Sequence, residues 1–506
     1  MSDPNFGVAI RRVDDEARPV LGADLSTIGI VGPAPGADPE LFPLNTPVLV
    51  RTNDGALVRG LGTQGYLRDS LEGIADQLGE LQRAARTIVV RTEAGTGSTA
   101  EDRLRSTLAN IVGSATEQTG IHSLKRAPAL LGVTPRLIIV PGYTGQTALG
   151  DRVGRIVQTS RGRGYAEGET YQLTINGPAT TPARAHAIGQ DDGSLGPAII
   201  DERGAGYANP PTVLAPDPDD EDGVRATFLA YIAQSANPVC AALPGVLNHL
   251  LGHGIVESSG VSRQDDFDWR ETMQSERLIP ISGGVQILDD ITGEVVTRPL
   301  APRIAGIAVR RDHEQGAPFH SWANQPVMGV VAPARDIDFS ILDGENEGQE
   351  LLGANIGVVV RGEIGSDFAI ASGGFVFIGT DNAGEDELWR FYNVTRGRDY
   401  IHIMLVRAVR FFLGRFNITG QTVQAILNTM GFALRDLQAD QHILGYRVNF
   451  NGQNNSAEQI RLGHLTVGFK AEEPPVLKRL TIESGRYRDA ITATITQLER
   501  MLNIAA

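Results

Sequence analysis

Two short segments near the C-terminus alternate apolar and polar residues, a pattern typical of half-buried strands. Their apolar faces consist of Leu465, Val467 and Phe469 and of Val476, Leu480 and Ile482. The joint between them is acidic and rich in proline: Glu472, Glu473, Pro474 and Pro475. Proline fits neither a helix interior nor a central strand, so we expect this joint to act as a hinge. Because a strand needs an edge to pair with, we hypothesise that the second segment pairs with another copy of the chain.

The same alternation near the start of the chain, in Phe6, Val8 and Ile10, predicts a short exposed strand. Farther along, apolar runs predict buried strands, and apolar spacings of three and four predict helices. We expect the strands at 25–31, 47–51, 87–91 and 136–140, and the helices at 66–85, 100–112 and 121–131. Strands that alternate with helices indicate a parallel α/β sheet. A helix at 226–236 and a strand at 238–243 are expected to extend that sheet.

Residues 146–225 are rich in Gly, Pro, Thr and Asp and show no amphipathic helical pattern. The sequence Arg-Gly-Arg-Gly-Tyr at 161–165 recurs as Arg-Gly-Ala-Gly-Tyr at 203–207, and each copy lies between apolar, strand-like segments. We therefore predict an inserted all-β domain built from a duplicated hairpin. A dinucleotide-binding loop would require a third glycine and a following helix, and both copies lack them.

The remaining chain combines strands and helices. Strands are predicted at 278–281, 285–288, 294–298 and 445–450, and a buried helix at 399–412. A second helix follows from the apolar positions Val423, Ile426, Leu427, Met430, Leu434 and Leu437. At the end of the chain, one helical face is predicted from Tyr487, Ile491, Ile495, Leu498 and Leu502.

These patterns predict a multidomain chain of the α/β class with additional β-rich parts. An N-terminal arm covers 1–20, and a discontinuous α/β core with its sheet and helices covers 21–145 and 226–375. The inserted all-β domain covers 146–225, an α+β C-terminal domain 376–459, and a C-terminal arm 460–506. Both arms are expected to be extended β-arms. A length of 506 residues accords with roughly two to four domains.

Charge and cysteine content exclude several classes of function. The net charge of −15 argues against general nucleic-acid binding, which requires a basic surface. Cys240 is the only cysteine, so the chain has no internal disulfide, as is typical of assembly in a reducing cytoplasm. The N-terminus lacks the pattern of a signal peptide. No apolar run approaches the ~20 residues that a membrane span needs, so we expect no membrane insertion.

Motifs for catalysis, cofactors or metals are not found. His249 and His253 are four residues apart and could share a helix face as metal ligands, but no third ligand is evident nearby, which favours a structural pair. Cys240 lies in an apolar context, where an inert buried thiol is usual. Residues 142–147 lack the lysine of a phosphate-binding loop, and no nucleophile elbow of the G-x-S-x-G type occurs. We therefore predict no catalytic, cofactor-binding or metal-binding residue.

Three stretches together resemble the contractile tail sheath proteins of bacteriophages. The first is residues 303–312 with 316–330, similar to the family's "aG…aR.D" strand followed by "G.w.sPAN..l.Gv". The second is residues 374–381, although this chain has Ile378 and Asp381 where the family motif usually has tryptophan and arginine. The third runs from 391–396, similar to the "f.nvrR" strand, to Phe416 and Asn417. Residues 26–36 also resemble the sheath opening strand.

The resemblance implies a structural protein of the virion tail, assembled in the host cytoplasm. Sheath subunits form stacked hexameric rings around a tail tube protein, and they also meet baseplate and tail terminator proteins. Terminal arms add strands to the sheets of neighbouring subunits, and contraction drives the tube through the host envelope as rigid subunits rotate into tighter packing. No cofactor, nucleic acid or membrane insertion is implied.

Two alternatives remain open at this point. The chain could instead be a hydrolase-like enzyme with an α/β core and a glycan-binding β insertion. A second open question concerns Arg407, Arg410 and Arg415, which form a local basic group in an acidic chain. These arginines could contact an acidic tail tube, or they could pair with carboxylates of the same chain.

Overall fold

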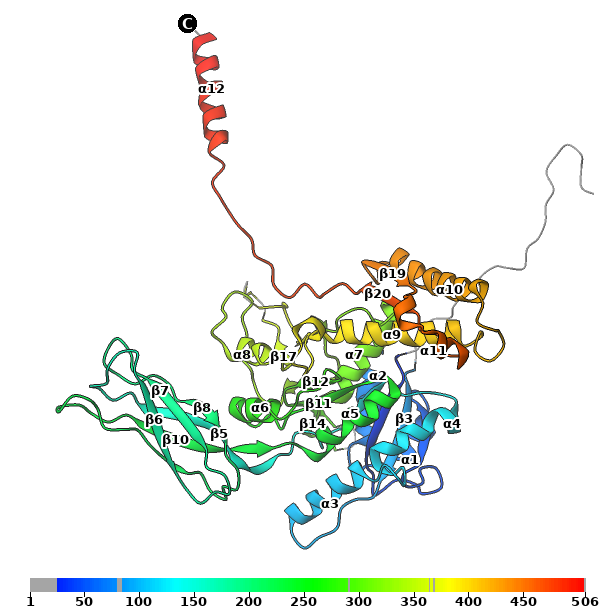
Figure 1. Ribbon diagram of the computed structural model, residues 1–506, viewed down its shortest axis with the longest axis horizontal. Helices are drawn as coiled ribbons and strands as arrows, with labels where there is room; N and C mark the ends of the chain where they lie inside the picture. The colour runs from blue at the N-terminus through cyan, green and yellow to red at the C-terminus, as the bar shows by residue number, and fades with distance from the viewer. Residues whose placement is uncertain (1–24, 80–83, 290–291, 364, 367–368, 505–506) are drawn as a thin grey trace, which may run out of the picture.

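The computed structural model describes residues 25–79, 84–289, 292–363, 365–366 and 369–504. Its centre is a six-stranded sheet in the order β12-β11-β4-β1-β3-β2 (Figure 1). The strands are β1 (Ile28–Pro33), β2 (Pro47–Arg51), β3 (Arg86–Thr92), β4 (Leu137–Ile139), β11 (His253–Glu257) and β12 (Leu278–Ile281). All neighbouring pairs are parallel except β2 with β3. Every residue of β1 is buried, as expected for a strand covered on both faces.

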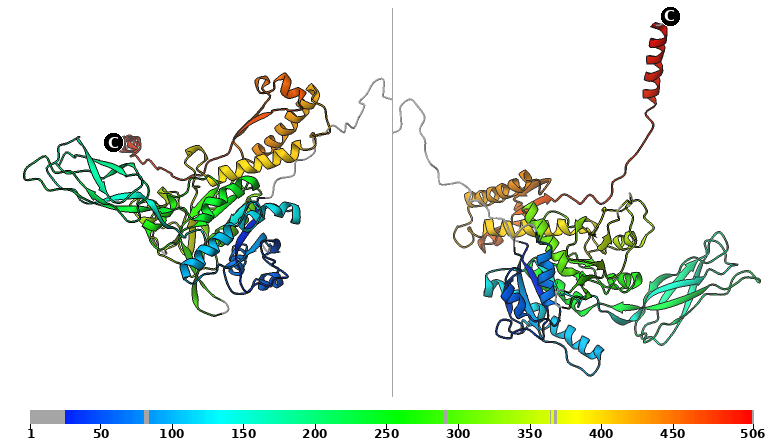
Figure 2. Two further views of the ribbon diagram at one scale, coloured as in Figure 1. Left: turned by 60° about the horizontal axis from the view of Figure 1, so that its bottom comes forward. Right: turned by 180° about the vertical axis from the view of Figure 1, so that it is seen from behind.

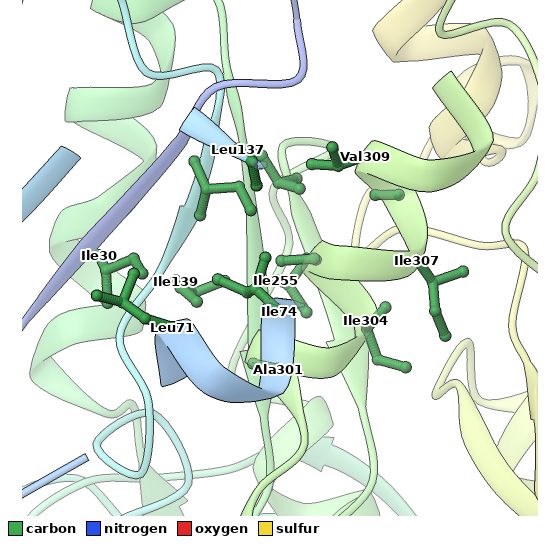
Figure 3. Close-up of a cluster of buried hydrophobic side chains, with 14 of the residues drawn as sticks. Ile30, Leu71, Ile74, Leu137, Ile139, Ile255, Ala301, Ile304, Ile307 and Val309 are labelled. Atoms are coloured by element: carbon green, nitrogen blue, oxygen red, sulfur yellow. The ribbon is translucent and has the colours of Figure 1, made fainter. Parts of the chain in front are cut away.

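Helices cover both faces of this sheet. On one face lie α2 (Leu67–Asp76) and α7 (Ala301–Gln315) (Figure 3). Leu71, Ile74 and Ala301 belong to one buried cluster with Ile30, Ile139 and Ile255, and Ile307 of the same cluster projects from the far side of α7. On the other face lie α3 (Ala100–Val112), η2 (Gly120–Arg126) and α5 (Pro238–Leu250). Three shorter helices, α1 (Gly55–Gly60), α4 (Ala127–Leu131) and α6 (Arg263–Arg270), complete this part.

Two motif stretches that the resemblance presented as strands are helical. Residues 303–312 lie inside α7, where Ile304, Ala305, Ile307 and Ala308 are all buried. Residues 392–396 form the first turns of α9 (Tyr392–Val409), so this helix begins seven residues before the predicted position. In both stretches nearly all residues are buried, and a helix packed on several sides gives the same apolar run as a strand covered on both faces.

The segment that was expected to extend the central sheet is also different. Residues 227–235 form strand β10 rather than a helix, with Phe228, Ala230 and Ile232 buried and Leu229 and Tyr231 exposed. This period of two places them in the inserted β domain. The predicted strand at 238–243 is instead the start of α5. Its N-terminus is capped by the side chain of Asn237, and a proline occupies the first helical position.

The inserted domain is a six-stranded antiparallel sheet in the order β5-β10-β9-β6-β7-β8, which projects from the core in Figure 1. Its strands are β5 (Ala148–Ser160), β6 (Thr170–Asn176), β7 (Arg184–Ile188), β8 (Ile199–Glu202), β9 (Thr212–Leu214) and β10 (Thr227–Ser235). The sheet therefore continues ten residues beyond position 225.

The two Arg-Gly-x-Gly-Tyr copies of this domain occupy equivalent positions. Both tyrosines are buried, and the Tyr165 and Tyr207 hydroxyls accept hydrogen bonds from the backbone N–H groups of Ala226 (3.0 Å) and Ala183 (2.8 Å). The glycines of both copies have positive φ, at 66° and 89° in the first and 65° and 86° in the second. When β5 is exchanged with β8, β6 with β9 and β7 with β10, the strand order becomes β8-β7-β6-β9-β10-β5. This is the original order read from the opposite edge of the sheet. The insertion is thus a pseudo-twofold domain.

Two small three-stranded sheets connect the core to the C-terminal part. One contains β13 (Gly284–Leu288), β14 (Val295–Pro299) and β16 (Ala332–Pro333). The other contains β15 (Gln325–Pro326), β17 (Val358–Arg361) and β18 (Phe375–Ile378), with α8 (Glu347–Gly353) beside it.

In the C-terminal part, α9 packs against α10 (Gly420–Ala439), which buries Ile426, Met430, Leu434 and Leu437 as predicted. Next to α10 lies a two-stranded antiparallel sheet of β19 (Gly445–Asn449) and β20 (Gly468–Glu472). Short helices η3 (Glu387–Trp389), η4 (Gly452–Asn454) and α11 (Ala457–Arg461) occupy the connections. After β20 an extended segment leads to α12 (Arg488–Ile504), which stands away from the body in every view (Figures 1 and 2).

Candidate functional site: the α9 junction and the C-terminal arm

The N-terminal half of α9 carries a buried ion pair that joins it to α7. The Arg396 guanidinium donates to both carboxylate oxygens of Asp312, at 3.0 and 2.6 Å, and the two side chains are only 1% and 5% exposed. Such a bidentate pair has the fork geometry that suits arginine and carboxylate. The same guanidinium lies over the Trp322 ring, with its carbon 4.8 Å from the ring centroid. Arg396 therefore fixes α9 to two other segments.

Tyr392 connects the remaining motif stretch, residues 374–381, to Trp322 and the start of α9. Its ring stacks on Trp322 with the centroids 4.4 Å apart. Its hydroxyl donates to the Gly379 carbonyl at 2.9 Å and accepts from the Trp322 N–H at 2.8 Å. Burial raises the pKa of Tyr392, so the hydroxyl stays a neutral donor. The three stretches that carry the resemblance thus converge at the start of α9, a junction that we call the α9 junction.

A second buried group ties α9 to the edge of the central sheet. Asp399 accepts from both Nη atoms of Arg277, at 2.5 and 3.3 Å. Burial alone would raise the pKa of Asp399, but hydrogen bonds from His402 and Arg277 lower it below its usual value. Nε2 of His253, on β11, lies 3.1 Å from the Thr395 hydroxyl. Burial lowers the pKa of His253 to about 3, so the imidazole is neutral near neutral pH.

These histidines do not form a metal site. His249 lies on α5 and His253 on β11, so the two histidines do not share a helix face. The alternative in which they are metal ligands on one helix is therefore wrong. Within the described ranges no three His, Cys, Asp or Glu side chains are grouped so as to hold a metal ion. Cys240 is buried in α5, with its thiol 3.4 Å from the Thr144 carbonyl oxygen. None of the helices in the described part of the chain is long and apolar enough to cross a membrane.

The predicted hinge is fixed on its N-terminal side. Glu473 is buried, and its carboxylate accepts from Nε and Nη2 of Arg398, both at 2.7 Å. Farther along, the Lys478 ammonium lies 2.5 Å from the buried Asp381 carboxylate, which also accepts from Arg390 at 2.9 Å. The residues from 479 to 502 are all exposed. The segment that is free of the body therefore begins after Lys478, well inside the arm predicted at 460–506. From here on, the name C-terminal arm refers to residues 479–487 alone.

The two predicted strands of this region lie in different surroundings. Leu465, Val467 and Phe469 are partly buried against the α9–α10 core of their own chain, and β20 pairs with β19. Leu480 and Ile482 lie in the extended arm and are 72% and 80% exposed. Because β19 and β20 form a two-stranded sheet among the described residues, each has an outer edge without a strand. Phe6, Val8 and Ile10 lie outside the described residues.

Comparison with known proteins places these observations in context. No protein-family model matches the chain. The tail sheath protein of Escherichia phage P2 is 22% identical over 500 residues, which cover 98% of both chains. A putative prophage major tail sheath protein of Pseudomonas aeruginosa is 21% identical over 93% of both chains. The resemblance to tail sheath proteins is therefore confirmed.

Solved structures with the same fold come from contractile injection systems. A chain of the contracted anti-feeding prophage baseplate has a TM-score of 0.57 and 12% identity, covering 96% of this chain and 98% of the other. A chain of the contracted PVC sheath complex has a TM-score of 0.56 and 10% identity, with coverages of 97% and 99%. At these identities the likeness shows the shared fold, and the sheath fold thus extends over nearly the whole chain.

The basic residues proposed to contact a tube lie at the C-terminal end of α9. Arg407 is partly buried, while Arg410 caps the helix and Arg415 is exposed. The Arg415 guanidinium lies 5.1 Å from the centroid of the exposed Phe411 ring. With Leu413 and Phe416, which are also exposed, this end of the sheath fold has a mixed basic and apolar surface.

Sequence reasoning missed the residues that anchor the arm. Arg398, Lys478 and Asp381 are distant in sequence from their partners, and no periodicity connects them. A signal did exist, because Arg396, Arg398 and Asp399 directly precede the apolar positions Tyr400, Ile401 and Ile403 of the same helix. Charged side chains are almost never fully buried unless they are paired. Asp381 stands where the sheath motif usually has arginine, and here it holds Lys478 instead.

Proposed function

We propose that this chain is the structural subunit of a contractile tail sheath, built as stacked hexameric rings around a tail tube within a virion tail. The full-length similarity to tail sheath proteins and the shared fold with contractile injection systems support this proposal. The relatives are structural proteins, so the proposed role involves no catalysis. The expected partners are the baseplate at one end of the sheath, a terminator protein at the other end, and the tube that the sheath encloses.

The observation that carries the proposal is the exposed C-terminal arm beside an incomplete sheet. Residues 479–487 are extended and unpaired with any described strand, and Leu480 and Ile482 expose most of their side chains. The β19–β20 sheet offers two outer edges whose backbone groups can accept another strand. Adding a strand from a second chain satisfies these groups and places alternate side chains against the sheet. The arm of one copy therefore completes the sheet of the next, and Phe6, Val8 and Ile10 supply the strand for the other edge.

The α9 junction suits a subunit that must move as a rigid body during contraction. Buried pairs such as Arg396–Asp312 and Arg277–Asp399 connect α7, α9 and the sheet edge, so the body resists internal deformation. The C-terminal arm, by contrast, is exposed along its whole length and keeps copies linked while the bodies rotate. Glu473 and Lys478 fix the point from which the arm leaves. New contacts between subunits then supply the free energy of contraction, without ATP or a metal.

The contact with the tube is assigned to the basic end of α9. Arg410 and Arg415 are exposed there, next to exposed aromatic side chains that such a contact would cover. In the Arg410→Glu variant, co-purification with the tube protein is expected to fall while assembly of the sheath itself continues. Unchanged co-purification would overturn this assignment. An equal loss in the Arg435→Glu variant, which changes an exposed arginine on α10, would show that the effect is not local.

The enzyme alternative gains no support from the carboxyl edge of the central sheet. Glu257 is the buried carboxyl group at the end of β11, and its two oxygens accept from the backbone N–H groups of Gly142 at 2.6 Å and Ala301 at 2.8 Å. Its hydrogen-bonding capacity is thus used to hold a loop and the start of α7. A catalytic role would need a nucleophile and a base that converge with this group.

Truncation tests the proposed assembly. Purified full-length chains are expected to form tubes in negative-stain electron micrographs. Chains that end at Lys478, or that lack residues 1–15, are expected to remain folded monomers with an unchanged unfolding midpoint. Ending the chain at Lys478 keeps Glu473 and its partner Arg398 in place, so a loss of tubes is due to the missing arm and not to a damaged body. Tubes of normal appearance from either truncated chain would refute the interlocking arms.

A further inference from the structure

The inserted domain is charged unequally at its two ends, a feature that the proposed function leaves unexplained. Three loops, residues 161–169, 189–198 and 215–226, join its strands at the end farthest from the core, which we call the distal tip (Figure 1). These loops carry nine carboxylates and three arginines. The rest of the domain, within residues 146–235, has four arginines and three carboxylates. The net negative charge of the domain is therefore confined to the distal tip.

The pseudo-twofold symmetry of the domain shows that the fold alone does not account for this asymmetry. The exchange of strands relates residues 161–165 at the distal tip to residues 203–207 at the opposite end. It also relates the loop 215–226, between β9 and β10, to the loop 177–183, between β6 and β7. The first of these two loops carries five carboxylates, whereas the second has no charged residue. Loops in equivalent places of one fold thus differ in charge.

The acidic loop 215–226 is held in a defined conformation that leaves part of its charge outside. The Asp219 carboxylate accepts a hydrogen bond from the Ala166 backbone N–H at 3.0 Å and another from the Tyr171 hydroxyl. Three further carboxylates of the loop are exposed and form no ion pair with the described residues of their own chain, namely Asp220, Glu221 and Asp222. The loop therefore presents a fixed group of unpaired negative charges.

A cleft of about 620 Å³ lies at the opposite end of the domain, between its strands and the core, and we call it the root cleft. Binding clefts have volumes of roughly 300–1,000 Å³, so this one has room for several side chains of another molecule. Both walls contribute arginines, which are Arg152, Arg155, Arg203 and Arg270. The carboxylates that line the cleft are Asp268, Glu271 and Glu385. The root cleft therefore has a net positive charge in an acidic chain.

The guanidinium groups of the root cleft are incompletely paired within the described residues. Arg155 lies over the Tyr231 ring, 4.2 Å from its centroid, and its Nε atom is buried without a hydrogen-bond partner. Arg270 donates to the Met273 carbonyl at 2.7 Å, and its Nε atom is likewise buried without a partner. Arg152 is exposed and forms no ion pair. Because arginine binds carboxylates strongly, the root cleft suits an acidic loop.

The distal tip and the root cleft cannot meet within one chain. They lie at opposite ends of a domain whose strand β5 has 13 residues and spans ~43 Å. A contact between them must therefore join two copies. Such a contact is heterologous, because it joins different surfaces of the two copies, and it repeats in one direction to give a ring or a helix. Stacked rings of equivalent subunits have this kind of symmetry.

We propose that the distal tip of one copy docks in the root cleft of a neighbouring copy, with carboxylates of the loop 215–226 paired to arginines of the cleft. A single exposed ion pair contributes little, so the contact depends on several charges acting together. It also depends on the high effective concentration of tip and cleft once copies are assembled. The inference thus rests on the proposed assembly and adds to it a contact between subunits outside the arms.

Zero-length cross-linking of the full-length chain tests the docking. The inserted domain contains no lysine, so a carbodiimide, which joins a lysine amine to a carboxylate, reports there only on lysines that are introduced. Arg152→Lys places an amine in the root cleft. Arg184→Lys places one at the same end of the domain but outside the cleft, as a matched control. A zero-length link to the distal tip must then come from a second copy.

Mass spectrometry of digested, cross-linked tubes gives the readout. Position 152 is expected to give several-fold more cross-link to the peptide that contains residues 217–222 than position 184. Arg203→Lys, a second position in the cleft, is expected to give the same preference and guards against a local effect of changing Arg152.

Microscopy of the same samples separates this inference from the proposed function. Tubes without a preference for the two cleft positions would overturn the docking and leave the sheath assignment intact. Absence of tubes would contradict the proposed assembly. If preferential cross-links still formed in that case, the docking alone would be supported, and if none formed, both would fall.

Discussion

The chain is held in two opposite ways on either side of Lys478. Up to that residue, buried ion pairs join segments that are far apart in sequence, as Arg398 does with Glu473 and Arg396 with Asp312. Beyond it, Leu480, Ile482 and the large apolar side chains of α12 are exposed. The α9 junction therefore belongs to the folded body of a single chain, whereas the arm contributes only when another copy is present. Substitutions on the two sides should separate folding from assembly.

The strongest effect on folding is expected at Arg396. Arg396→Ala leaves the Asp312 carboxylate buried without its partner, and breaking a buried pair in this way typically costs about 3–5 kcal/mol. The free energy of unfolding, measured with urea, should fall by that amount. Arg415→Ala removes an exposed arginine of the same domain and should change it by less than about 0.5 kcal/mol. Equal stabilities of the two variants would mean that the junction does not hold the body together.

His253 should make the junction sensitive to acid. The unfolded imidazole takes up a proton near pH 6.5, whereas burial lowers the folded pKa to about 3, so stability falls as the pH drops through this window. Between pH 7 and 5 this amounts to about 2 kcal/mol. Burial also raises the pKa of Glu257 to about 7, which gives an opposite slope over the same range. The effect of His253 is therefore isolated by comparing the pH dependence of stability in wild type and in His253→Gln. The variant keeps the pH dependence that comes from Glu257 and the other groups and loses that of the histidine.

The measurement is the pH dependence of the unfolding free energy of both proteins. His253→Gln should lose less stability than wild type on acidification from pH 7 to 5, by about 2 kcal/mol. Parallel pH profiles would show that the histidine is already protonated in the folded state or accessible to water. The hydrogen bond with Thr395 predicts a pH-independent loss in the variant, which shifts the whole curve without changing this difference.

The body of the fold was predictable where the apolar residues fit only one kind of element. Strands β2 and β3 follow from their short apolar runs, because helices cover both faces of the sheet. Helix α3 follows from its apolar spacing of three and four. Strand β10 was misread because Phe228, Tyr231 and Ile232 also satisfy a helical spacing, and only pairing with β5 selects the strand. The anchors of the arm could not be predicted, because Arg398 and Glu473 are 75 residues apart and meet through tertiary structure. For the same reason, the sequence could not show that Glu473, within the predicted hinge, is buried.

Arg398 and Lys478 test where the arm begins. Arg398→Ala leaves Glu473 buried and unpaired, and it should destabilise the body by about 2 kcal/mol, since Arg398 itself is partly exposed. Lys478→Ala should cost less than about 1 kcal/mol, because Lys478 is 37% exposed and Arg390 still neutralises Asp381. Urea unfolding of both variants measures this order. A larger loss for Lys478→Ala than for Arg398→Ala would mean that the chain before the arm is held mainly by Lys478 and not by Glu473.

The smallest effect on folding is expected in the arm itself, with the largest effect on assembly. Leu480→Ser combined with Ile482→Ser removes two side chains that are already exposed, so the unfolding midpoint should not change. Tube formation should be lost, because these side chains provide the apolar face that the strand presents to the sheet of the next copy. Leu477→Ser, on the opposite face and 77% exposed, is the matched control and should assemble normally. If the control failed and the double variant assembled, the arm would present the face of Leu477 to the next copy. That result would correspond to a register shifted by one residue.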